Sequence, residues 1–217
     1  MNFNPGNKPV PIVKQDAELL FELFGGDCKF WVAGGRAISY HFNRADKTQD
    51  IDLFFSCVED YEFAKSKLDE YLLTENFVES DYNFVTHDTK NAITYIFHKD
   101  SSRHETARIQ LIKKVFATTK DLFEHFDMGH CEIAYQFYKS IFSKQKPYVA
   151  QPEYSRNFVK SWGTKTVMVK KITPNTMARI SKAVALGLIL DSKTIKMLSE
   201  YTAKGGEFVQ SNEYDFI

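Results

Sequence analysis

The chain has 217 residues, of which 43% are hydrophobic and 15% aromatic, so it can bury the core of one domain, with or without a smaller appendage. Its three cysteines are widely spaced and lie in no Cys/His cluster, which argues against a zinc site and indicates reduced thiols. No apolar run approaches the ~20 residues that cross a bilayer, and residues 1–13 lack an apolar signal core. We therefore expect a cytoplasmic protein with no membrane partner.

The charge is unevenly distributed, although the formal net charge is zero. Between Lys139 and Lys196 there are twelve basic residues and two acidic ones. This asymmetry predicts two domains, 1–138 and a basic, partly helical 139–217. The basic segment also carries aromatic residues, namely Phe142, Tyr148, Tyr154, Phe158 and Trp162. Such a mixture suits single-stranded nucleic acid, and a lysine-rich surface over an aromatic core is the alternative.

Hydrophobic periodicity along the chain predicts alternating helices and strands. Strands are expected at 29–33, 51–55, 83–86, 93–98 and 108–112. Helices are expected at 16–24, 36–42, 59–73, 118–126, 173–190 and 191–203. We expect Asp16 to cap the first helix, and Pro147 and Pro152 mark 145–162 as a loop-rich connection. The predicted fold is α/β, a small mixed sheet with packed helices, followed by a helical C-terminal part from about residue 173.

Residues 30–55 combine a strand, two glycines, a helix and a second strand. Gly34 and Gly35 stand at the strand-to-helix turn, where glycine lets the backbone approach a triphosphate closely. The N–H groups of the following helix can then bind that anion. Arg36, in the first helical turn, is a candidate for a bidentate phosphate contact. This turn is therefore the candidate nucleotide-binding element.

Two carboxylates follow at Asp50 and Asp52, at the start of the second strand. Side chains two apart on a strand share a face, so both point the same way. Asp52 lies between Ile51 and Leu53, where a carboxylate without a cation would be costly to bury. Two such carboxylates can hold Mg²⁺ or Mn²⁺ against a triphosphate. Both aspartates are therefore the candidate catalytic and metal-binding residues.

This arrangement resembles the nucleotidyltransferase superfamily of DNA polymerase beta, CCA-adding enzymes and their small relatives. The chain looks most similar to the small nucleotidyltransferases encoded by phages and large viruses. Three later segments support the resemblance: RIQLI at 108–112, FDMGHCEIAY at 126–135 and RISKAVALGL at 179–188. The last segment adds Arg179 and Lys182 as candidate nucleotide-binding residues.

One position departs from the family pattern. The superfamily usually places a third carboxylate on a neighbouring strand, and the resemblance puts Gln110 there. A neutral amide can orient a hydroxyl but is a poor general base. Asp127 or Glu105 could supply the missing charge, the two aspartates could suffice, or catalysis could be weak.

The resemblance implies transfer of a nucleoside monophosphate from an NTP to a hydroxyl, with release of pyrophosphate. An RNA 3′ end, such as that of tRNA, is the leading acceptor. Two alternatives remain open: the same chemistry on a protein or small molecule, as in toxin–antitoxin and resistance enzymes, or a catalytically weak module that binds nucleotide or RNA.

Overall fold

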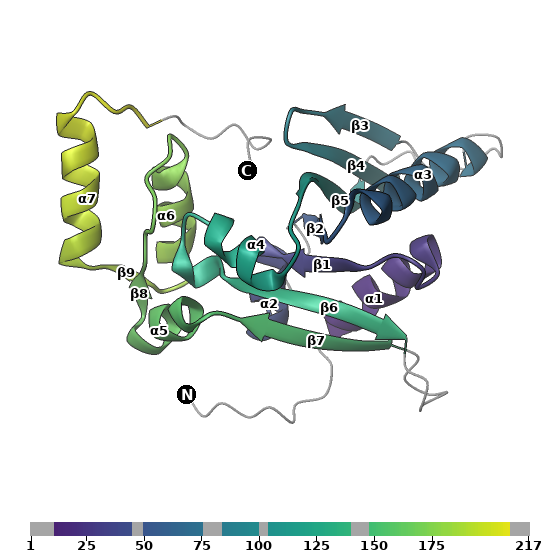
Figure 1. Cartoon of the computed structure of the whole chain (residues 1–217), viewed down its shortest axis with the longest axis horizontal. Helices are drawn as coiled ribbons and strands as arrows, with labels where there is room; N and C mark the ends of the chain where they lie inside the picture. The colour runs from purple at the N-terminus through teal and green to yellow at the C-terminus, as the bar shows by residue number, and fades with distance from the viewer. Residues whose placement is uncertain (1–10, 45–49, 76–83, 100–103, 140–147, 209–217) are drawn as a thin grey trace. The chain divides into compact units, whose positions relative to one another are not determined.

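The computed structural model describes residues 11–44, 50–75, 84–99, 104–139 and 148–208 (Figure 1). The chain divides into two compact units. The first comprises Met1–Thr118 and Ala134–Glu153, and the second comprises Thr119–Ile133 and Tyr154–Ile217. The domain division expected from the sequence, 1–138 and 139–217, stays a prediction.

The first unit is built on a mixed seven-stranded sheet. In chain order, its strands are β1 Phe30–Ala33, β2 Ile51–Phe55, β3 Phe84–Asp88, β4 Ala92–Lys99, β5 His104–Val115, β6 Ile133–Lys139 and β7 Tyr148–Tyr154. Their order across the sheet is β3-β4-β5-β2-β1-β6-β7. The β2–β5 pair is parallel, whereas β1–β2, β1–β6, β3–β4 and β4–β5 are antiparallel. The α/β class predicted from the sequence is confirmed.

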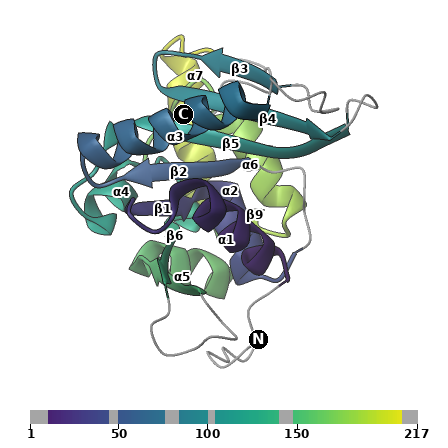
Figure 2. The ribbon, with the colours of Figure 1, turned by 90° about the vertical axis from the view of Figure 1, so that its right-hand side faces the viewer.

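Three helices belong to this unit: α1 Pro11–Phe24, α2 Gly34–His41 and α3 Val58–Glu75. Helix α3 packs on β2 and β5, and α1 lies beside α3 over the sheet (Figure 2). Two contacts fix α3 in place. The Tyr61 ring packs edge-on against Phe55 of β2, and the Tyr95 hydroxyl of β4 donates a 2.8 Å hydrogen bond to Asp69 of α3.

Strand β2 has an apolar face toward α3 and an opposite face that carries Asp52 together with the buried Phe54. Ile51, Leu53 and Phe55 are buried, and the Phe55 contact shows that this set faces α3. Because side chains alternate along a strand, Asp52 projects from the opposite face of the sheet. The packing of these apolar residues against α3 therefore determines the face of the sheet on which Asp52 lies.

A buried ion pair joins α1 to α2. The Arg36 guanidinium donates to both carboxylate oxygens of Asp16, from Nε at 2.6 Å and from Nη2 at 2.8 Å, and the Tyr40 hydroxyl also donates to Asp16. The Arg36 and Asp16 side chains are each 7% exposed. The prediction that Asp16 caps the helix is wrong, because α1 begins a turn earlier, at Pro11, a residue suited to a first helical turn.

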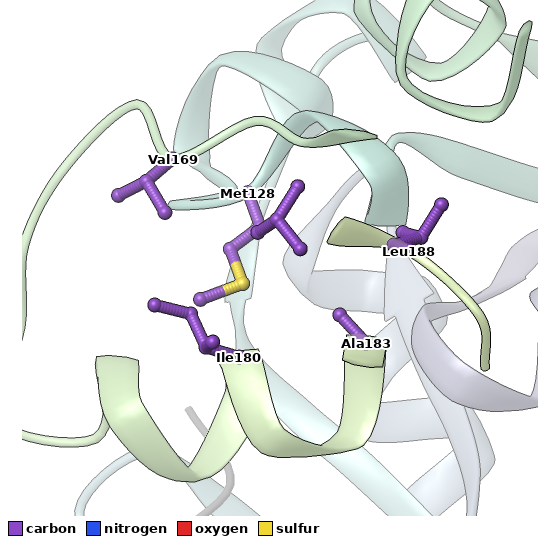
Figure 3. Packing of buried hydrophobic residues seen from close by; sticks show 6 residues of the cluster. Met128, Val169, Ile180, Ala183 and Leu188 are labelled. Carbon is purple, nitrogen blue, oxygen red and sulfur yellow. The ribbon is translucent and has the colours of Figure 1, made fainter. Parts of the chain in front are cut away.

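The second unit consists of short elements. They are α4 Thr119–His125, the 3₁₀ turn Gly129–Cys131, α5 Arg156–Thr164, β8 Thr166–Val167, α6 Thr176–Ala185, β9 Ile189–Leu190 and α7 Ser192–Ala203. Their apolar core gathers around Met128, whose side chain reaches toward Ile180 with Val169, Ala183 and Leu188 nearby (Figure 3). Asp191 caps α7 by accepting from the Thr194 N–H at 2.7 Å.

The loop-rich connection predicted at 145–162 is wrong. The structure has β7 and α5 there, while residues 145–147 lie outside the described part. Pro152 is tolerated within β7 because this strand ends the sheet order, so one side of it needs no N–H donor. Ser155 then caps α5 by accepting from the N–H groups of Asn157 and Phe158. The helix predicted at 173–190 is wrong at its end, because α6 stops at Ala185 and Ile189–Leu190 form β9. The other predicted helices and strands exist, with ends shifted by a few residues.

No helix among the described ranges has both the length and the apolar character needed to cross a membrane.

We predict that Asp16→Asn destabilises the protein by about 3 kcal/mol, because it leaves the buried Arg36 charge without a counter-ion. Urea unfolding measures this loss. Glu18→Gln is the matched control, because it breaks an exposed ion pair with Lys14 on the same helix and should cost less than about 1 kcal/mol. Equal losses in the two variants would show that the buried pair does not stabilise the fold.

Candidate active site

The turn between β1 and α2 presents backbone donors. Ala33 ends β1 in an extended conformation and precedes α2 without a side-chain cap, and Gly34 has a φ of +71°. A positive φ of this kind is strained for residues with a Cβ, which explains the glycine. The first N–H groups of a helix lack partners within the helix and favour anions. The turn can therefore bind a phosphate group.

Asp52 lies directly against this turn. A Cβ placed on Gly34 would lie 2.8 Å from the Asp52 Oδ2 atom, closer than any relaxed contact. Glycine is thus required at position 34 both for its conformation and for the space that Asp52 occupies. As a result, the carboxylate and the potential phosphate site are adjacent.

Sheet pairing places Gln110 beside Asp52. In the parallel β2–β5 ladder, Asp52 is the partner of Gln110, and in the β4–β5 ladder Gln110 is the partner of Thr94. On the other side, Asp52 pairs with Ala33 of β1. A single row across the sheet therefore runs from Thr94 through Gln110 and Asp52 to the β1–α2 turn.

The Gln110 amide is buried and held in position. The residue is 6% exposed, and its Nε2 donates a 2.9 Å hydrogen bond to the Thr94 hydroxyl. Its Oε1 atom is buried and accepts no hydrogen bond from the described residues. A buried acceptor left in this way is costly unless a ligand or water satisfies it. The Oε1 atom is therefore a candidate ligand atom at the site.

Arg108 neutralises one of the two aspartates. Its Nη1 lies 3.3 Å from the Asp50 Oδ1 atom, and both side chains are 16% exposed. Arg108 precedes Gln110 by two residues on β5, as Asp50 precedes Asp52, so the four side chains belong to the same face of the parallel pair. This cation was not expected from the sequence.

The donor set suits a single hard cation. Aspartate and amide oxygens are the ligands that Mg²⁺ and Mn²⁺ prefer, and Asp52 with the buried Gln110 Oε1 offers such oxygens from adjacent strands. Among the residues that the structure describes, no three His, Cys, Asp or Glu side chains form a metal-binding group. Asp50, Asp52 and the Gln110 amide therefore remain the candidate ligands of a divalent ion.

The other candidate residues have different partners. The Arg36 guanidinium binds Asp16 and so joins α2 to α1. In the second unit, Arg179 of α6 donates a 2.7 Å bond to the buried Asp127, and Lys182 is exposed on the same helix. The Glu105 side chain lies outside the described residues. The roles of Arg36, Arg179 and Lys182 in nucleotide binding stay predictions.

Comparison with known proteins identifies the family. Residues 12–165 match the model of the Gabija anti-defense 2 family. The chain belongs to this family. A comparison with curated protein sequences gave no significant match.

Solved structures show which fold the family member adopts. The Thermotoga maritima CCA-adding enzyme complexed with tRNA is similar with a TM-score of 0.53 and 14% identity, over 91% of this chain and 46% of that one. A CCA-adding enzyme with ATP gives a TM-score of 0.54 at 14% identity, over 90% and 43% of the two chains. A complex with CTP gives 0.54 at 16%, over 90% and 42%. The nucleotidyltransferase fold is therefore confirmed, and the chain spans less than half the length of these enzymes.

We predict that Gly34→Ala lowers the affinity for a non-hydrolysable ATP analogue with Mg²⁺ by at least about tenfold, a loss of 1.4 kcal/mol. The new methyl group would displace the Asp52 Oδ2 atom and strain the turn. Isothermal titration calorimetry measures the affinity. Gly187→Ala is the matched control, because Gly187 has a φ of +90° but nothing within 4 Å of the added Cβ. Equal affinities for the two variants would refute a nucleotide site at Gly34.

Proposed function

We propose that this chain is a metal-dependent nucleotidyltransferase that moves a nucleoside monophosphate from an NTP to a hydroxyl acceptor and releases pyrophosphate. The observation that carries this proposal is the contact between Asp52 and the glycine turn. It joins a potential metal ligand to a potential phosphate site across two adjacent antiparallel strands.

Each group at the site has a role in this reaction. The backbone N–H groups at Gly34 and Gly35 bind the triphosphate, and Asp50 and Asp52 hold Mg²⁺ or Mn²⁺. When bound, the cation supplies charge neutralisation at the phosphates. Arg36 positions the β1–α2 turn through its bond to Asp16 of α1. Gln110 offers its buried Oε1 as a neutral ligand for the cation beside the acceptor, since its Nε2 already donates to Thr94.

The acceptor oxygen forms a bond to the α-phosphorus while the bond from that phosphorus to the bridging oxygen breaks. Pyrophosphate leaves with the electron pair of the broken bond. The hydroxyl proton passes to a carboxylate or to water, since an amide such as Gln110 is a poor base.

An RNA 3′ end is the acceptor that the fold supports first. Its solved relatives include an enzyme complexed with tRNA. Helix α5 of the second unit also presents exposed Arg156 and Lys160, to which a phosphate backbone could bind. The family description favours a second candidate. In this candidate, the acceptor hydroxyl belongs to a component of the Gabija defence, and the transferred nucleotide would inactivate that component.

We predict that Asp52→Asn reduces transfer by more than about a hundredfold, since even indirect partners of metal ligands are worth 10- to 100-fold. The assay incubates each α-³²P-labelled NTP with Mg²⁺ or Mn²⁺ and lysate from cells with or without the Gabija genes. Label that appears in RNA from both lysates supports an RNA acceptor. Label that appears in a protein only when the Gabija genes are present supports the second candidate.

Asp69→Asn is the matched control. Asp69 binds Tyr95 and Lys65 on the opposite, helix-covered face of the sheet, so its loss should leave transfer within about twofold of wild type. Absence of transfer by the folded wild-type protein with every nucleotide and metal would contradict the proposal and favour the binding-module alternative.

A further inference from the structure

We propose that the active site binds one divalent cation and that the Arg108 guanidinium supplies the positive charge that a second cation would bring. This inference rests on the proposed nucleotidyl transfer and concerns how the same site neutralises the triphosphate. It predicts a site that differs in composition from the two-metal arrangement, in which ions ~3.5–4 Å apart hold the attacking and leaving oxygens.

The charge of the site supports a single cation. Asp50 and Asp52 carry one negative charge each, Arg108 carries one positive charge, and Gln110 is neutral. The four side chains on this face therefore total −1. A bound triphosphate brings negative charge of its own, but a second divalent ion at this site would lie near a fixed guanidinium, which repels it.

The available ligand atoms also indicate one bound cation. An oxygen of Asp50 is held by Arg108 at 3.3 Å, in a pair that is largely shielded from solvent. Gln110 stands beside Asp52 in the parallel ladder, at the position where the resemblance implies a third carboxylate, but its amide offers a single neutral oxygen. That buried Oε1 accepts no hydrogen bond from the described residues, and it can complete the shell of one ion.

Arg108 is well placed to act on phosphate. It lies on β5, next to β2, on the same face as Asp52 and two residues before Gln110. A guanidinium has five N–H donors in a planar fork, so contact with Asp50 is compatible with contacts to phosphate oxygens. Arginine in such a role is worth roughly 10³- to 10⁵-fold in other phosphoryl transfers.

The test counts Mn²⁺ ions bound to the full chain with an α,β-methylene ATP analogue, using electron paramagnetic resonance. The wild type should bind one Mn²⁺ and show no spin-coupled signal. The double variant Arg108→Gln/Gln110→Glu places three carboxylates at the site and should bind two Mn²⁺ ions with a coupled signal. A coupled pair in the wild type, or no bound Mn²⁺, would overturn the inference.

Transfer activity provides the second readout. Arg108→Gln should still bind one Mn²⁺ yet lose about 10³-fold in transfer, and Arg108→Lys should recover part of that loss. Lys113→Gln is the control. Lys113 lies on β5, as Arg108 does, and its loss breaks an ion pair with Asp88 of β3, so this variant should keep both properties. Full activity in Arg108→Gln would also refute the inference. An active wild type with two coupled ions contradicts only this inference, whereas an inactive wild type contradicts the proposed function itself.

Discussion

The parallel pairing of β2 with β5 is the constraint on which the candidate site depends. It sets Asp52 beside Gln110 and brings Arg108 to Asp50, although these pairs are nearly sixty residues apart in the chain. The alternation of β2 then turns its apolar residues toward α3 and its carboxylate toward the opposite face. If β2 slipped by one residue, the carboxylate would enter the apolar core, so packing under α3 specifies the register of the site.

The β1–α2 turn adds the second half of the site and is itself supported from α1. Gly34 leaves room for the Asp52 carboxylate because it lacks a Cβ, and Arg36 connects the first turn of α2 to Asp16. A buried ion pair of this kind is weak evidence for net stability, but loss of one partner leaves an unpaired charge. Its use here is positional, since it fixes the direction in which α2 presents its N–H groups.

The local parts of this arrangement could be predicted from the sequence, and the pairwise parts could not. The glycines and the Asp-x-Asp strand lie within twenty residues, so their order alone indicated a phosphate and metal site. Arg108 as the partner of Asp50 depends on strand pairing, which no local pattern reveals. The sequence also predicted that Asp16 is a helix cap, because its partner Arg36 lies on another helix. It predicted a loop in place of β7 and α5, because the edge position that tolerates Pro152 is a property of the whole sheet.

The most direct test of the site is cleavage of the backbone by Fe²⁺ substituted for the bound cation, with ascorbate and peroxide in the presence of an NTP. The account predicts cuts confined to three segments, at residues 33–36, 50–53 and 108–111, which the β1–β2 and β2–β5 pairings and the glycine turn bring together. Excess Mg²⁺ should suppress these cuts. NTP-dependent cleavage only at other segments would place the metal elsewhere and contradict the assignment of Asp50 and Asp52.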